Sequence, residues 1–306
     1  MTKLHRSSYA PASSVNGGSI KYFIKYTPSL SLIETIDAKA ERAILSAVLN
    51  DGHVRKSQNV VVKLGISRNL KTDYSTASKL YKKIPGFMKY ICGFECPDDV
   101  ARYSNHAQST KPASLCLSSE SGADQVYVLV MPHIAKGSML AYSWNTRNFP
   151  MLKSCLKQVV LSLATAFEMF GFLHSDVHLE NILIRSTSKE QIAYDIANVS
   201  IPSHGVQVCI MDLEYAFMNA RPTETIMFFK DIKHLFSDIS YRLKLDLEGF
   251  NAIETFLLER TFKPRALHDA YRLLPMIDAM VFKGVQKPRT IEYDPNVFGG
   301  GNWGSF

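Results

Sequence analysis

The residues best suited to chemistry lie in one short segment and at one position about thirty residues later. The segment is His174-Ser-Asp-Val-His-Leu-Glu-Asn181, and the later position is Asp212, at the end of an apolar run. An Asp on a rigid loop can orient a hydroxyl group and accept its proton. Polar groups beside buried elements cost stability unless something uses them, so this order predicts a functional site. The alternative is that Asp176 and Asn181 cap loops and that Asp212 is a turn residue.

Strands in the first half and helices in the second must position these residues, which predicts an α+β fold in two lobes. We expect strands at Ile20 to Tyr26, Val60 to Leu64 and Gln125 to Met131, and helices at Ile33 to Leu49, Asp73 to Tyr81 and Met151 to Phe170. Two apolar runs, 181–184 and 206–211, flank a polar stretch, 185–205, that we expect to be a surface excursion. The last third, from Phe228 to Phe282, should be mostly helical, with Gly249 and Pro264 as breakers.

Composition and charge give weaker indications. The 306 residues are 46% hydrophobic and 21% charged, which is ordinary for a globular protein, and no run of about eighteen apolar residues occurs. These features, and the polar N-terminus, predict a soluble, unsecreted, cytoplasmic protein with no membrane partner. The five scattered cysteines indicate reduced thiols. The formal charge of +7 suits an anionic partner, but its densest group, Lys79 to Lys89, resembles a solvated helix side, which argues against nucleic acid. The oligomeric state stays open.

The two motifs resemble those of the protein-kinase-like superfamily. His174 to Asn181 is similar to the catalytic loop H-R-D-L-K-x-x-N, and Asp212-Leu213-Glu214 occupies the place of D-F-G. The resemblance runs from about Val60 to Ser240. It implies a two-lobed protein-kinase-like fold, with a small β-rich N-lobe at 20–131, a larger helical C-lobe at 132–295, and flexible ends at 1–19 and 296–306.

The resemblance also implies roles in phosphoryl transfer from ATP. Asp176 would be the base or hydroxyl-orienting residue, while Asn181 and Asp212 would hold Mg²⁺. His178, where most protein kinases have Lys, can donate to the γ-phosphate, or it is a solvated loop histidine. His174 would be structural, packed beneath the loop, and Asp231 would brace the loop backbone.

The nucleotide site would begin at Lys63, which interrupts the apolar strand and fits the lysine of V-A-I-K. We expect it to point into the interlobe cleft within ion-pair reach of Asp212 or an acidic residue of a neighbouring helix. The alternative is an edge-strand lysine that faces solvent.

The adenine would be held by a second group of residues. The resemblance implies that Val61 and Leu183 sandwich the base, that Met131 lies near the gatekeeper position, and that backbone groups around His133 bind the adenine edge. An ordinary strand end at 131–134 is the alternative reading of this segment.

Three departures from the kinase pattern bear on activity. The only candidate for a Gly-rich loop, Asn16 to Ser19, is separated from Lys63 by the expected helix at 33–49. The helix after Lys63 has no Glu at the expected place, so Asp73, Glu34 or Glu41 would have to substitute. Ser175 replaces the Arg of H-R-D, and the stretch from Asp212 to Asp231 is short and lacks A-P-E, which argues against activation by loop phosphorylation.

Three functions remain open. The leading one is an ATP- and Mg²⁺-dependent serine/threonine kinase with a protein substrate. The alternatives are a pseudokinase scaffold, favoured by the missing Gly-rich loop, and a small-molecule kinase of the aminoglycoside or choline kinase type, favoured by His178 and Glu214. Lys79 to Phe87 and Tyr90 to Phe94 resemble the divergent kinases of large eukaryotic DNA viruses, which would imply the cytoplasm of an infected cell.

Overall fold

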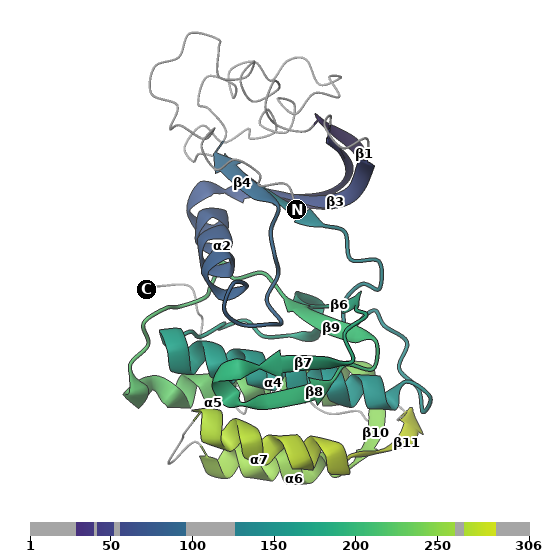
Figure 1. Cartoon of the computed structure of the whole chain (residues 1–306), viewed down its shortest axis with the longest axis vertical. Coiled ribbons are helices and arrows are strands. Elements are labelled where there is room, and N and C mark those ends of the chain that lie inside the picture. Colours follow the sequence, from purple (N-terminus) through teal and green to yellow (C-terminus); the bar gives the residue numbers. More distant parts are fainter. Residues whose placement is uncertain (1–28, 40–41, 52–55, 96–125, 261–265, 286–306) are drawn as a thin grey trace.

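The computed structural model describes residues 29–39, 42–51, 56–95, 126–260 and 266–285, and these residues build two lobes (Figure 1). The smaller lobe is a sheet with one helix, and the larger lobe contains most of the helices. The α+β, kinase-like fold expected from the sequence is confirmed. No helix among the described residues is long and apolar enough to cross a membrane.

The small lobe is an antiparallel sheet of five strands in the order β1-β2-β3-β5-β4. Its strands are β1 (Ser29–Lys39), β2 (Arg42–Asp51), β3 (Lys56–Ile66), β4 (Cys92–Glu95) and β5 (Val126–Pro132). Because side chains alternate along a strand, β3 and β5 present two different faces. Val60, Val62 and Leu64 join a small separate core on one face. Val61 and Lys63 therefore lie on the opposite face.

The helix expected at 33–49 is wrong, because this segment forms β1 and β2. Positions four apart lie on one side of both a helix and a strand, so the apolar spacing was ambiguous. Burial now shows a period of two: Ala47 and Leu49 are buried, and Val48 between them is half-buried. The Asn-Asp-Gly signal at 50–52 ends a strand instead of a helix, and Asp51 pairs with Lys56 of β3. The strand expected at 20–26 lies outside the described residues.

Helix α2 (Ser67–Leu80) and the segment after it connect the two lobes. Its buried residues Leu70, Ala77 and Leu80 share one face, which packs into the main core. The helix predicted at 73–81 is therefore confirmed, with an earlier start. After α2 the chain makes a close contact with the large lobe, because the Ile210 N–H donates to the Gly86 carbonyl at 2.7 Å.

Helix α4 (Phe149–Phe170) is the central element of the large lobe and is buried along most of its length, as its pattern predicts. It ends at Gly171, whose φ of +55° is the left-handed conformation typical of a helix C-terminus. A single 3₁₀ turn, η3 (Leu179–Asn181), closes the catalytic-loop segment. Strands β6 (Ile182–Ser186) and β9 (Val206–Ile210) follow and pair antiparallel, which confirms the two apolar runs.

The stretch between β6 and β9 is more structured than expected. Residues 185–191 are exposed or half-buried, but β7 (Gln191–Tyr194), the 3₁₀ turn η4 (Asp195–Ala197) and β8 (Val199–Pro202) form a hairpin against α4. Tyr194 is 1% exposed and its hydroxyl donates to the Gln158 carbonyl at 2.9 Å. The prediction of a simple surface excursion is therefore wrong, because every second residue of β7 faces the core.

The last third of the chain is mostly helical, as expected. Its described residues form α5 (Thr225–Leu243), α6 (Phe250–Arg260) and α7 (Ala266–Ala279), and the 3₁₀ turn η5 (Pro222–Glu224) precedes them. Two short strands, β10 (Leu245–Glu248) and β11 (Val281–Val285), pair beside them. Gly249 does separate β10 from α6 with a φ of +88°, while Pro264 lies outside the described residues.

Candidate active site

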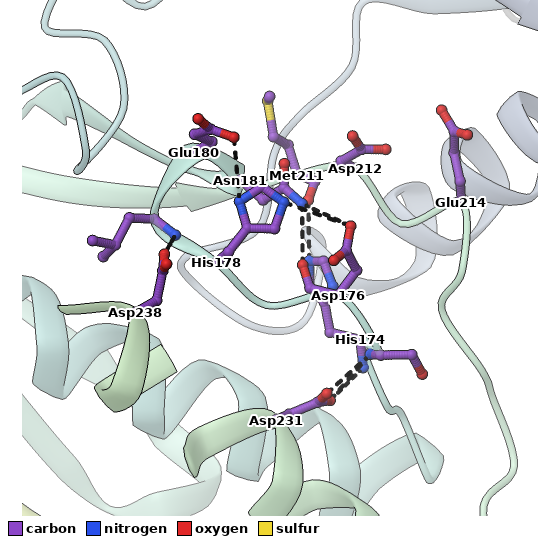
Figure 2. Close-up of polar contacts among 12 residues, drawn as sticks. His174, Asp176, His178, Glu180, Asn181, Met211, Asp212, Glu214, Asp231 and Asp238 are labelled. Carbon is purple, nitrogen blue, oxygen red and sulfur yellow. Dashed lines mark hydrogen bonds and ion pairs between the residues drawn. The ribbon is translucent and has the colours of Figure 1, made fainter. Parts of the chain in front are cut away.

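The loop that begins at His174 is fixed from below by helix α5 (Figure 2). Asp231 is buried and its carboxylate accepts the backbone N–H groups of His174 and Ser175 at 2.9 and 3.1 Å. Burial raises the pKa of Asp231 to about 6, against the opposing effect of these two bonds. His174 is fully buried, and its Nε2 lies 3.1 Å from the Met211 carbonyl oxygen. Both residues therefore have the positions that the resemblance implies.

Two residues of the site have left-handed backbone conformations. Ser175 has a φ of +66° and Asp212 a φ of +62°, a region in which residues other than Gly are uncommon. Such strain persists only where surrounding contacts enforce it, and it concentrates at functional sites. Here the enforcing contacts are the Asp231 bonds on one side and the Met211 N–H, which donates to the Asn181 carbonyl at 3.0 Å, on the other.

Asp176 and Asn181 face each other across the loop. The Asn181 side chain is buried, and its Nδ2 donates to the Asp176 carbonyl at 3.1 Å and approaches the Asp176 Oδ2 at 3.5 Å. Because the amide nitrogen is engaged, the amide oxygen remains for another partner. The Asp176 side chain is 38% exposed, so it can reach a substrate.

His178 lies between two carboxylates (Figure 2). Its Nε2 is 3.6 Å from Asp176 Oδ2, and its Nδ1 is 3.7 Å from Glu180 Oε2. Interaction with Asp176 raises the pKa of His178 above its ordinary value, against the effect of burial. Burial would raise the pKa of Asp176, but His178 outweighs it and the pKa is lowered. A positively charged His178 beside an ionised Asp176 is therefore favoured.

A second acid of α5, which we did not predict from the sequence, also holds the loop. Asp238 accepts the Leu179 N–H at 2.8 Å through Oδ2 and binds Arg242 Nε at 2.8 Å through Oδ1. Arg242 Nη1 also lies 3.0 Å from Glu180 Oε1. Asp231 and Asp238 are two helical turns apart on a face that is otherwise apolar. That spacing was the available signal.

Lys63 joins the small lobe to Asp212. Its ammonium group lies 2.7 Å from Asp212 Oδ1 and also contacts Glu214. Burial lowers the pKa of Lys63, but the carboxylates of Asp212, Glu214 and Asp73 outweigh it and the pKa is raised, which favours the charged side chain. The expected approach of Lys63 to Asp212 is present. In the sequence Glu214 was noted as part of the Asp-Leu-Glu motif and as support for a small-molecule kinase, and its contact with Lys63 was not foreseen.

The acid supplied by the helix after Lys63 is Asp73 of α2. It is fully buried, accepts a hydrogen bond from the Tyr90 hydroxyl at 2.8 Å, and has its pKa raised to about 7 by burial. Carboxylate oxygens of Asp73, Asp212 and Glu214 all lie within 4.8 Å of one another. Asp73 therefore stands beside Lys63, whereas Glu41 lies outside the described residues.

The expected adenine residues are brought together in part. Val61 and Met131 are partners in the β3–β5 register, and Leu183 packs, half-buried, against the same core. His133 is exposed, and its backbone N–H already donates to the Asn59 carbonyl at 3.1 Å. Of the backbone groups of His133, only the carbonyl is therefore available to bind the edge of an adenine.

No protein-family model matches the chain. Over 172 residues it is 23% identical to the serine/threonine-protein kinase haspin of Mus musculus. The matched region covers 54% of this chain and 22% of that protein. The haspin of Bos taurus is 24% identical over 168 residues, and that match covers 54% of this chain and 22% of the bovine protein. The Drosophila melanogaster haspin homolog is 40% identical over 72 residues, with shares of 21% and 13%.

The chain thus matches about a fifth or less of the length of these curated relatives. These three relatives are animal proteins named as haspin kinases, and the closer likeness to viral kinases stays a prediction. Together with the fold, these partial similarities support a likeness of the chain to the protein-kinase-like superfamily.

Proposed function

We propose that the chain is an ATP- and Mg²⁺-dependent kinase that transfers phosphate to Ser or Thr of a protein. The observation that carries the proposal is the 2.7 Å contact between Lys63 and Asp212, which are 149 residues apart. A charged lysine in the otherwise apolar run Val60 to Leu64 is costly to bury without a charged partner. Its position between the two lobes, next to the loop of Asp176, suits the phosphates of a nucleotide.

The nucleotide would lie on the face of the sheet that carries Lys63. Val61, Met131 and Leu183 would contact the base, and the His133 carbonyl would accept from its exocyclic amine. The hairpin of β1 and β2 directly precedes β3, and at one end of it Lys39 pairs with Arg42, which pairs with Gly65 of β3. This end of the hairpin lies two residues beyond Lys63 in the β3 register and would take the place of a Gly-rich loop. The small lobe, at 20–131, would thus cover the nucleotide without the motif at 16–19.

The donors near the phosphates suit magnesium. Asn181 offers an amide oxygen and Asp212 a carboxylate, and oxygen ligands of this type are those that Mg²⁺ prefers. Both come from backbone held by the contact of Met211 with Asn181. The bound ion would neutralise the negative charge of the phosphates.

The acceptor hydroxyl would be oriented by Asp176. Its lowered pKa keeps the carboxylate ionised, and its partial exposure lets it accept a hydrogen bond from Ser or Thr. His178 would take over the place of the usual lysine and, when protonated, donate to the transferred group. Asp231 and Asp238 keep the loop in this position through its backbone.

The contact of Glu214 with Lys63 favours one competing function. A carboxylate on the lysine occupies the position expected for a phosphate, which is compatible with a scaffold that binds no nucleotide. The small-molecule kinase alternative also uses Glu214, and only substrate tests separate it from a protein kinase.

The decisive experiment is a thermal shift with ATP, in Mg²⁺ and in EDTA. A ligand present at about 100 times its Kd stabilises the native state by about 2.7 kcal/mol, so binding is readily detected. We expect a shift for wild type in Mg²⁺, a smaller shift for Lys63→Met, and an unchanged shift for Lys71→Met, whose lysine pairs with Glu95 on the surface. If wild type shows no shift at any ATP concentration, the scaffold function replaces the kinase.

A further inference from the structure

The segment between α2 and β4 is clamped to the strand that leads to Asp212. The Gly86 carbonyl accepts the Ile210 N–H at 2.7 Å, and the Met88 N–H donates to the Ile210 carbonyl at 2.9 Å. Ile210 is therefore bound on both sides by the same short segment. Because Ile210 precedes Asp212 by two residues, these two hydrogen bonds also fix the backbone that leads to Asp212.

The same segment is also attached to helix α4. Ser162 Oγ donates to the Pro85 carbonyl at 2.8 Å. Gly86 has a φ of +99°, and a Cβ at this position would lie 2.2 Å from Ser162 Oγ. Only glycine allows so close an approach, so this contact fixes the segment after α2 against helix α4 of the large lobe.

Tyr90 connects this fixed segment to helix α2. The Ile91 N–H donates to the Val130 carbonyl at 2.9 Å, so Tyr90 is held between an anchor on β9 and one on β5. Its hydroxyl donates to Asp73 Oδ1 at 2.8 Å, and both side chains are buried. Asp73 lies on the apolar face of α2, where a carboxylate needs partners to remain ionised.

We propose that Tyr90 is a positioning residue that holds Asp73 of α2 against Lys63, and thereby directs the lysine to the phosphates of the nucleotide. The inference rests on the proposed function and deepens it. Among the described residues, Lys63 contacts Asp212 and Glu214 from the segment after β9, and a carboxylate oxygen of Asp73, from α2, lies within 4.8 Å of theirs. When Asp212 and Glu214 turn to other partners, Asp73 is the acid that keeps Lys63 in place.

Tyr90→Phe tests this role, because it removes one hydroxyl group and keeps the ring. A hydrogen bond to a charged group contributes enough that its loss should weaken ATP affinity by about tenfold. The matched control is Tyr74→Phe, since Tyr74 is on the same helix as Asp73 and its ring centroid lies 6.4 Å from that of Tyr90. The control should bind ATP like wild type.

A double-mutant cycle separates positioning from a general structural effect. If Tyr90 acts through Asp73, Tyr90→Phe should raise the Kd of ATP in the wild-type background but not in an Asp73→Asn background. Loss of stability alone would lower the melting temperature of both backgrounds and leave the Kd of the folded protein unchanged, which would overturn the inference. Absence of ATP binding by wild type would overturn the proposed function instead.

Discussion

Gly171→Ala should disrupt the segment that follows Asp212. Gly171 has a φ of +55°, and a Cβ there would lie 2.4 Å from the backbone oxygen of Ala220. The same stretch is joined to the catalytic-loop side by backbone bonds, from the Ala220 N–H to the Gly171 carbonyl at 2.9 Å and from the Leu173 N–H to the Phe217 carbonyl at 2.9 Å. These bonds hold the segment in place.

The expected cost can be worked out from these contacts. A left-handed conformation costs a residue with a Cβ about 1 to 2 kcal/mol. Relief of the clash requires Ala220 to move, which would break about two backbone hydrogen bonds at about 1 kcal/mol each. The sum is about 3 to 4 kcal/mol, a large fraction of the stability of a typical domain.

Gly205→Ala provides the control. Gly205 has a similar φ of +78°, but nothing lies within 4 Å of its added Cβ. Urea denaturation should therefore give a loss of about 1 to 2 kcal/mol for Gly205→Ala and about 3 to 4 kcal/mol for Gly171→Ala. Equal losses in the two variants would refute the argument that the segment is packed against the helix end.

Three further predictions follow from buried groups. Burial raises the pKa of Asp73 from 3.8 to about 7, so its contribution to stability is fully present below pH 3.8 and is lost as the pH rises through about 7. In Asp73→Asn the free energy of unfolding should fall less over this pH range, as measured by urea unfolding at several pH values. An identical pH profile for the variant and wild type would contradict the prediction. Asp238→Ala should leave the Leu179 N–H without its acceptor and destabilise the protein by about 1 to 3 kcal/mol, whereas Asp195→Ala, at an exposed position, should cost under about 0.5 kcal/mol. Amides of β7 and β8 should exchange more slowly than those of residues 187–190, and uniform fast exchange would show that the hairpin is not packed on α4.

The parts of the fold that were predictable have strong local patterns. Helix α4 shows a sustained period of 3.6, and the resemblance to the kinase motifs implies that Asp176, Asn181 and Asp212 belong to one site. Lys63 was recognisable because a lone charge in an apolar strand needs a partner. Each of these signals is contained in a short stretch of sequence.

The predictions that failed concern segments whose structure depends on contacts with distant parts of the chain. Residues 33–49 fit a helix and a strand equally at four-residue spacing, and only the pairing of β2 with β3 decides between them. The β7–β8 hairpin was missed because its apolar residues are few and their partner is α4. The segment that begins at Tyr90 gave no local sign of the hydrogen bond from Tyr90 to Asp73, which lies 17 residues earlier.

The most direct test of the account compares Asp176→Asn and Asp212→Asn. Each protein would be assayed for phosphate transfer from ATP to a Ser-rich protein, beside its ATP- and Mg²⁺-induced thermal shift. If Asp176 orients the hydroxyl and Asp212 holds the metal, Asp176→Asn keeps the thermal shift and loses most of the transfer, whereas Asp212→Asn loses both. Full transfer by both variants, from a wild type that is active, would contradict the account.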